Sequence, residues 1–191
     1  VAIADNYAYI AAQDGSMYAI EISDPTNPVE TKWKQETGLL YTDIAVQDNY
    51  AYVATANDGL HIMSIANPAI PEEVGSLDLP GSIELVTIDH RGYVYVTNSL
   101  GELHIVNVAD PKHPVKVGSY SGVWGSVDIA ADGYAYLAAG ASGVCVLNVA
   151  DRANPVSVGC YKTPGVARSV RVVGEYVYVA DWRNGLVILK I

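Results

Sequence analysis

The sequence contains no phenylalanine and only three tryptophans, yet it has 14 tyrosines among its 191 residues. It is also poor in basic residues, with 11 lysines and arginines against 21 aspartates and glutamates, which gives a formal net charge of −10. A chain this acidic is repelled by nucleic-acid phosphates and by anionic membrane surfaces. We therefore expect no nucleic-acid partner.

Long apolar runs are absent as well. No stretch approaches the roughly 18 apolar residues in a row that a membrane-spanning helix needs. The first residues, VAIADNYAYI, have neither the basic start nor the apolar core of a secretory signal. Half of the residues are nevertheless hydrophobic and 17% are charged, so a chain of this length can bury a core. The sequence predicts a single domain over residues 1–191, without membrane insertion.

Ten of the 14 tyrosines occur as Tyr-x-Tyr pairs that recur along the whole chain. A glycine follows each pair, and a proline-marked turn follows the glycine in the first four units, as SDPTNP, ANPAIP, ADPKHP and ADRANP. The chain therefore consists of five units of about 42 residues, a period in the range of known structural repeats. The second tyrosines of the pairs are Tyr9, Tyr52, Tyr95, Tyr136 and Tyr178.

Short alternating or β-branched runs predict strands in every unit, and nothing predicts a helix. The second unit alone offers four strands: TDIAVQ, YAYVATA, LHIMSI and EEVGSL. A period near 42 with four strands is typical of a propeller blade, which must stack on its neighbours to bury both faces. We therefore predict an all-β protein, a β-propeller of about five four-stranded repeats. The approximate repeat bounds are 1–40, 41–84, 85–125, 126–168 and 169–191.

The last unit is incomplete. It offers SVRVVG, YVYVADW and GLVILKI and then no fourth strand. Two arrangements remain open at this point, a five-bladed ring with a three-stranded last blade or a part of a larger propeller. An uncovered sheet edge invites pairing with another chain, so a partner protein or a second copy could pair with the fifth blade.

The third strands and the turns after them resemble a known repeat. GLHIMSIANPAIPEEVG, ELHIVNVADPKHPVKVGSY, GVCVLNVADRANPVSVGCY and the final GLVILKI are similar to the LVIVD repeat. The resemblance implies a propeller of the kind found in bacterial and archaeal proteins that are often exported or held at the cell surface. It implies no shared catalytic signature. Where that repeat usually has an acid in the third strand, this chain has Glu21, Ser64, Asn107, Asn148 and Lys190.

The loop ADWRNG is the richest candidate for binding. In propellers, the loops between second and third strands gather on one face with the loops that lead to the next blade. Trp and Arg are the residue types most enriched at binding hot spots. The alternative is a purely structural role, in which these side chains only pack on neighbouring loops or pair with local acids. The candidate binding residues on this face are Asp181, Trp182, Arg183 and Asn184 in ADWRNG, Trp124 in SGVWG, and Arg168 in PGVARS.

The two cysteines fall on the third and fourth expected strands of one unit, on either side of ADRANP. If Val149 faces Val156 across that hairpin, Cys145 faces Cys160, and directly opposed residues lie within reach of a disulfide. The alternative is two small buried thiols. A bond would indicate an oxidising compartment.

Neither calcium nor zinc is expected. Asp14, Asp58 and Asp181 recur near turn glycines, but each loop offers too few oxygens for calcium, and Asp is an ordinary turn residue. His61 and His104 occupy one column of neighbouring units, where the distance between stacked sheets keeps zinc ligands apart. We expect both histidines to cover the sheet or bond locally, and we predict no metal and no cofactor.

No linear catalytic motif is present, whether Gly-x-Ser-x-Gly, a phosphate loop or His-Glu-x-x-His. We therefore favour a non-enzymatic protein-interaction or scaffold module of a surface or extracytoplasmic assembly, which binds through loops on one propeller face. The alternative is a carbohydrate-binding, hydrolytic or lyase propeller with its site at the mouth of the central channel, because propellers assemble sites from several blades.

Overall fold

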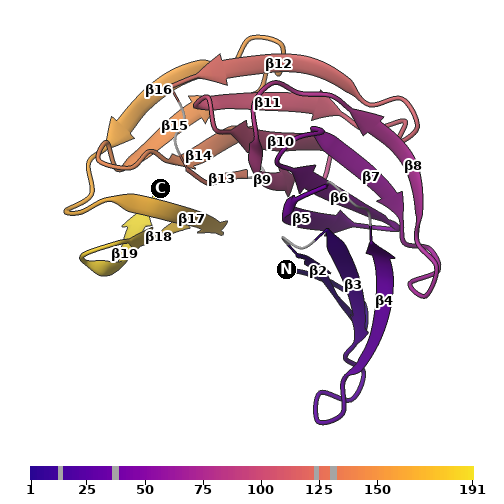
Figure 1. Cartoon of the computed structure of the whole chain (residues 1–191). Coiled ribbons are helices and arrows are strands. Elements are labelled where there is room, and N and C mark those ends of the chain that lie inside the picture. Colours follow the sequence, from indigo (N-terminus) through magenta and orange to yellow (C-terminus); the bar gives the residue numbers. More distant parts are fainter. Residues whose placement is uncertain (13–14, 36–38, 123–124, 130–132) are drawn as a thin grey trace.

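The computed structural model describes residues 1–12, 15–35, 39–122, 125–129 and 133–191, and every regular element in them is a strand. The strands form five antiparallel sheets in chain order, four with four strands and the last with three. These sheets are blades 1 to 5 of a β-propeller (Figure 1). The fold expected from the repeat is confirmed. No helix that could cross a membrane occurs in the residues named above.

Each blade is a meander in which strands pair in sequence order. Blade 1 contains β1 (Ala2–Ala4), β2 (Tyr7–Ala11), β3 (Ser16–Glu21) and β4 (Val29–Gln35). Blade 2 contains β5 (Tyr41–Gln47), β6 (Tyr50–Thr55), β7 (Leu60–Ser64) and β8 (Glu72–Leu77). Blade 3 contains β9 (Ile83–Ile88), β10 (Tyr93–Asn98), β11 (Glu102–Asn107) and β12 (Val115–Ser121). Blade 4 contains β13 (Val127–Ile129), β14 (Tyr134–Ala138), β15 (Val144–Asn148) and β16 (Val156–Tyr161), and blade 5 contains β17 (Ala167–Val173), β18 (Tyr176–Asp181) and β19 (Gly185–Lys190).

Consecutive blades pack face to face. We call the face that carries the second tyrosine of each pair the tyrosine face, and the opposite one the aliphatic face. Tyr52 and Ile62 on the tyrosine face of blade 2 are buried against Val94 and Val96 on the aliphatic face of blade 3. The other three junctions are built in the same way. Because strand side chains alternate between faces, the Tyr-x-Tyr spacing puts both tyrosines on one face of each blade.

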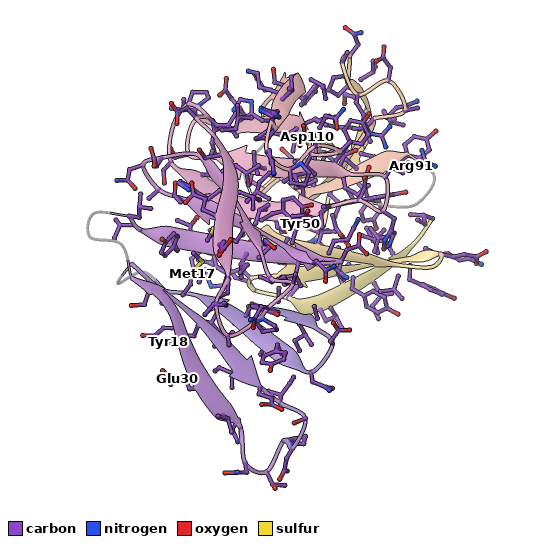
Figure 2. All side chains as sticks on the ribbon, turned by 90° about the vertical axis from the view of Figure 1, so that its right-hand side faces the viewer. Met17, Tyr18, Glu30, Tyr50, Arg91 and Asp110 are labelled. Carbon is purple, nitrogen blue, oxygen red and sulfur yellow. A yellow bond between two sulfur atoms is a disulfide. The ribbon has the colours of Figure 1, made fainter. Side chains whose placement is uncertain are left out.

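Two neighbours on β3 show this alternation. Met17 lies on the tyrosine face of blade 1, where it packs toward blade 2 and is only 1% exposed. Tyr18 lies on the aliphatic face and is half-buried (Figure 2). The two faces of blade 1 are therefore unequally covered.

Glycines permit the tight turns and the close approach of blades. The five glycines predicted between second and third strands have φ between 71° and 84°, which favours glycine over other residues. Gly118 on β12 has a different reason, since a Cβ there would overlap the backbone carbonyl oxygen of Arg152 in the next blade.

The five blades form an arc with blades 1 and 5 at its two ends (Figure 1). On the outer face of blade 1, Val1 and Ile3 are 76% and 66% exposed, and on the outer face of blade 5, Leu186 and Ile188 are 63% and 53% exposed. The two end blades are therefore not packed against each other as neighbouring blades are.

Candidate functional site

The turn between β18 and β19 presents an exposed tryptophan beside two arginines. The Trp182 side chain is 65% exposed. The Arg168 guanidinium carbon, from β17, lies 4.7 Å from the centre of the Trp182 ring, and that of Arg183 lies 5.9 Å from it. Both distances are within the range of cation–π contact. The structure thus brings three of the sequence-predicted residues into one cluster, which we call the Trp182 cluster.

Asp181 holds this turn in place. The Asp181 side chain is only 1% exposed, and its Oδ2 accepts a hydrogen bond of 2.9 Å from the Gly165 amide. The Trp182 amide donates to the Val166 carbonyl oxygen at 3.0 Å, which fixes the backbone beneath the indole. Gly165 cannot carry a side chain here, because a Cβ would overlap the Asp181 carboxylate. Asp181 is therefore buried within the turn, where it positions the backbone.

The ionisation of Asp181 agrees with that role. Burial alone would raise its pKa, but hydrogen bonding to the carboxylate, above all from the Gly165 amide, holds the pKa below its ordinary value. The Asn184 amide also donates to the Asp181 carbonyl oxygen at 2.9 Å. Asp181 and Asn184 thus serve as internal anchors of the Trp182 cluster.

The cluster has a defined recognition chemistry. An indole face offers a large apolar surface with little conformational entropy to lose, and guanidiniums bind carboxylates through paired N–H groups. Arg168 and Arg183 are both exposed, so these donors are open to a ligand. The sixth predicted residue, Trp124, lies outside the described residues.

The inner strands line a second feature, an axial cavity of about 910 Å³. Its walls come from all five blades and include Asp43, Asp89, Asp128, Arg152 and Arg171. Side chains of these charged residues form hydrogen bonds that link one blade to the next. The carboxylate of Asp43 accepts from the Val86 amide at 3.0 Å, and that of Asp128 accepts from the Val172 amide at 2.7 Å. Burial raises the pKa of Asp43, and its hydrogen bonds only partly oppose that effect.

One of these cross-blade links is an ion pair that sequence analysis missed. Arg152 in the turn of blade 4 donates from Nη2 to Asp89 Oδ2 of blade 3 at 2.9 Å, and its guanidinium lies 4.1 Å from the Tyr93 ring centre. Asp89 also accepts from the Tyr95 hydroxyl at 3.2 Å. The sequence did contain a sign of this role, because Arg152 replaces the first proline that the turns of the first three units have at this position.

The histidine column makes local contacts. His61 lies 3.3 Å from Asp58 and 3.4 Å from Glu73. His104 lies 3.2 Å from the Asn98 side chain, and burial, aided by Lys116, lowers the pKa of His104. Within the described part of the chain, no group of three or more His, Cys, Asp or Glu side chains could hold a metal ion.

Cys145 and Cys160 form a disulfide between β15 and β16. They are direct partners in the strand register, although Val156 pairs with Asn148 and not with Val149 as expected. A bulge between Val146 and Leu147 shifts the register by one residue and brings the two cysteines opposite each other.

The class that the structure defines is that of the β-propellers, here with an aromatic and cationic cluster on one loop. The chain belongs to the LVIVD repeat family, whose repeat matches residues 1–32, 41–79, 90–122, 126–163 and 164–191. The resemblance seen in the third strands is thereby confirmed. No curated protein matches the sequence.

Solved structures share the fold at low identity. The β-propeller domain of Cps50 (Swd1) from Myceliophteria thermophila has a TM-score of 0.78 at 13% identity, with 97% of this chain and 67% of that chain covered. BamB from Moraxella catarrhalis has a TM-score of 0.72 at 16% identity, with 99% and 56% covered. The periplasmic gluconolactonase PpgL from Pseudomonas aeruginosa has a TM-score of 0.78 at 12% identity, with 97% and 63% covered. The chain thus spans 56% to 67% of the length of these propellers, and the likeness concerns the fold alone.

Proposed function

We propose that the protein is a non-enzymatic interaction module that binds an acidic segment of another protein through the Trp182 cluster. One observation supports this most directly: an exposed indole lies beside two exposed guanidiniums, on a turn whose backbone is anchored by a buried carboxylate. A pre-organised aromatic and cationic surface loses little entropy on binding. A partner with carboxylates beside an aromatic or apolar side chain matches it chemically.

The setting of the module is part of the same proposal. The disulfide between Cys145 and Cys160 would persist in an oxidising compartment. This favours an extracytoplasmic or cell-surface assembly, in line with the family resemblance. The axial cavity is the weaker candidate for a site, because its Asp43, Asp89 and Asp128 carboxylates accept hydrogen bonds that link adjacent blades.

A fluorescent peptide of alternating glutamate and tyrosine tests the proposal, with a lysine–tyrosine peptide of equal length for comparison. In fluorescence polarisation, the intact chain is expected to bind the acidic peptide through the Trp182 cluster. Trp182→Ala and Arg168→Ala should each weaken binding by at least about tenfold, the size of a modest hot spot. Both side chains are exposed, so stability should change by less than about 0.5 kcal/mol.

Lys112→Ala is the matched control, since it removes one exposed cation from a turn between a third and a fourth strand, at the other end of the blades. It should leave peptide binding unchanged. Full binding of the acidic peptide by the Trp182→Ala and Arg168→Ala variants would contradict the proposal, and so would binding of the lysine peptide that these variants weaken to the same extent.

A further inference from the structure

A second pocket lies at the junction of blades 1 and 2 and shares no lining residue with the axial cavity. Its volume is about 230 Å³. Blade 1 contributes Asp5, Tyr7 and Tyr9 to its wall, and blade 2 contributes Asp48 and Pro68. We call it the Tyr7 pocket. It combines aromatic rings with acidic side chains, which is a surface that attracts cations.

The corresponding place between blades 3 and 4 is occupied by an arginine of the chain itself. There the Arg152 guanidinium carbon lies 4.1 Å from the centre of the Tyr93 ring, and Nη2 donates to the Asp89 carboxylate at 2.9 Å. The Tyr95 hydroxyl donates to the same carboxylate at 3.2 Å. This junction is thus completed by a guanidinium that lies against an aromatic face and pairs with an acid.

The repeat gives the junction of blades 1 and 2 the same tyrosines but no arginine. The tyrosine pairs that begin β2 and β10 are equivalent to each other. Pro68 is equivalent to Arg152, because each is the fourth residue after a third strand, β7 or β15. A proline side chain carries no charge and no hydrogen-bond donor. The Tyr7 pocket is therefore lined by the counterparts of the arginine and of its two tyrosines, without the cation that joins them at the other junction.

An acid is present at both junctions in a similar place. Asp5 comes directly after β1, as Asp89 comes directly after β9. Burial raises the pKa of Tyr9, and Tyr7 and Asp5 raise it further. Burial raises the pKa of Tyr95 to about 12, with Asp89 as the next largest cause. In both junctions, therefore, a carboxylate charge acts on the hydroxyl of the second tyrosine.

We propose that the Tyr7 pocket binds the guanidinium group of a ligand, in the place that Arg152 takes at the other junction. The Tyr7 ring offers a face to the cation, and the exposed Asp5 carboxylate accepts from its N–H groups. The pocket is smaller than the roughly 300–1,000 Å³ typical of sites for drug-sized ligands, so it suits one cation the size of a side chain. That cation is a small alkylguanidinium or an arginine side chain of another protein.

Ethylguanidinium chloride is the probe, because it carries the group that Arg152 presents and little else. Titrated into the isotope-labelled chain, it should shift the amide signals of Tyr7 and Asn49 in the NMR spectrum, with a dissociation constant on the order of 1 mM for so small a ligand. Ethylammonium chloride has the same charge and controls for the general attraction of cations to an acidic chain. It should bind at least about threefold more weakly, since an ammonium lacks the planar fork of donors.

A blocked pentapeptide with one central arginine among glycines distinguishes the two sources of the group. Tighter binding of this peptide than of ethylguanidinium identifies an arginine side chain of another protein as the ligand. Equal or weaker binding identifies a small alkylguanidinium.

Three variants test the assigned residues. Asp5→Asn removes the charge and keeps a residue that tolerates the φ of 50° at this position, and it should weaken ethylguanidinium binding about threefold. Tyr7→Leu removes the ring face and should have an effect of similar size. Pro68→Arg should fill the pocket from within and abolish binding, and the turn of blade 4 shows that arginine fits at this position.

Glu175→Gln is the matched control, because Glu175 is an exposed acid in the corresponding turn of blade 5. It changes the net charge as Asp5→Asn does and should leave binding unchanged. The amide spectrum of each variant shows whether it is folded before affinities are compared.

The occupied junction provides the reciprocal experiment. Arg152→Ala removes the guanidinium from beside Tyr93 and Asp89, so ethylguanidinium should bind there in the variant and shift the Tyr93 amide signal. A ligand that binds the folded state should also raise the melting temperature of this variant more than ethylammonium does. The unaltered chain should show no such shift at Tyr93, because Arg152 already holds the place.

Three results would overturn the proposal. Ethylguanidinium could leave the signals of the Tyr7 pocket in place up to tens of millimolar, well above the affinity expected on the order of 1 mM. Ethylammonium could bind equally well, which would assign the shifts to general attraction of cations. Binding could also persist undiminished in Asp5→Asn, Tyr7→Leu and Pro68→Arg, which would place the cation elsewhere.

Discussion

At the scale of residues, the turn 181–184 divides its work between neighbours. Asp181 is buried and holds the loop 163–166, while Trp182 is exposed and available to a partner. Asp181 is the last residue of β18, and the alternation of strand side chains points it inward. Trp182 follows in the turn, where its side chain points to solvent. The buried anchor supports the proposed interaction site, because site residues work best when their neighbours hold them in place.

Arg152 is the residue whose loss should cost the most among the cross-blade links. Its pair with Asp89 is largely buried, with side-chain exposures of 15% and 8%. Arg152→Ala would leave the Asp89 carboxylate without its cation, so the free energy of unfolding should fall by about 3 kcal/mol. Urea denaturation of the variant measures this change. A loss below about 0.5 kcal/mol, the usual size for a surface site, would contradict the structural role.

The candidate site could be predicted from sequence only where its residues are local. ADWRNG was predicted as a candidate because tryptophan and arginine stand out in a repeat that does not need them. The burial of Asp181 could not be predicted, because its partner Gly165 lies 16 residues away. Arg152 and Asp89 are 63 residues apart, and only the stacking of blades brings them together.

At the scale of elements, the turns between third and fourth strands share one hydrogen bond. Asp24, Asn67, Asp110 and Asp151 each accept from the amide two residues further on. This explains why an acid or amide recurs in the proline-marked turns. Asn67 shows that the bond does not need a charge.

These turns should make stability sensitive to acid. The pKa of Asp24 is lowered by Thr26, that of Asp110 by His113 and Lys112, and that of Asp151 by Asn154 and Ala153. A lowered folded-state pKa stabilises the protein above the unfolded value near 3.8, and this contribution is lost as the pH falls through the folded value.

Replacement of the three aspartates by asparagine should keep the bonds and remove their titration. Between about pH 5 and pH 2, the melting temperature of the triple variant should fall less than that of the unaltered chain. Asn67→Asp provides the reverse control and should increase acid sensitivity. Parallel melting curves for all three proteins would refute this account.

The hairpin of β15 and β16 carries the disulfide, which closes a loop with a sequence separation of 15. Its removal in a Cys145→Ala, Cys160→Ala double variant should lower the free energy of unfolding by about 3 kcal/mol. Chemical denaturation with and without reductant measures the change. The reductant should destabilise the unaltered chain and leave the double variant unaffected, and equal effects on both would count against the expectation.

At the scale of the whole molecule, the repeat made the architecture predictable. The spacing of Tyr-x-Tyr pairs and glycines gave the number of blades, because strand alternation and turn geometry are local properties. How blades 1 and 5 lie relative to each other depends on the curvature accumulated over four junctions. No short stretch of sequence determines this total curvature. The sequence therefore could not distinguish a closed five-bladed ring from an open arc.

Stability should be graded along the arc. Blade 3 is covered on both faces, whereas blades 1 and 5 are each covered on one. In dilute protein, amide hydrogen exchange should therefore be slowest in β9 and β10 and faster in β2, β18 and β19, because opening an end blade breaks only one junction. Uniform protection over the five blades would contradict this gradient.

The four junctions between blades are built alike, and this has a consequence for how proteins with this repeat evolve. Duplication of one unit of about 42 residues adds a blade, and loss of one unit removes a blade. In both cases the same kinds of face meet again at the new junction, so the neighbouring blades need no compensating substitutions. Unequal recombination between repeats can therefore produce, in a single event, folded proteins that differ in their number of blades. Lineages with this repeat should vary in length by whole blades while the loops, including the one that carries Trp182, diverge independently.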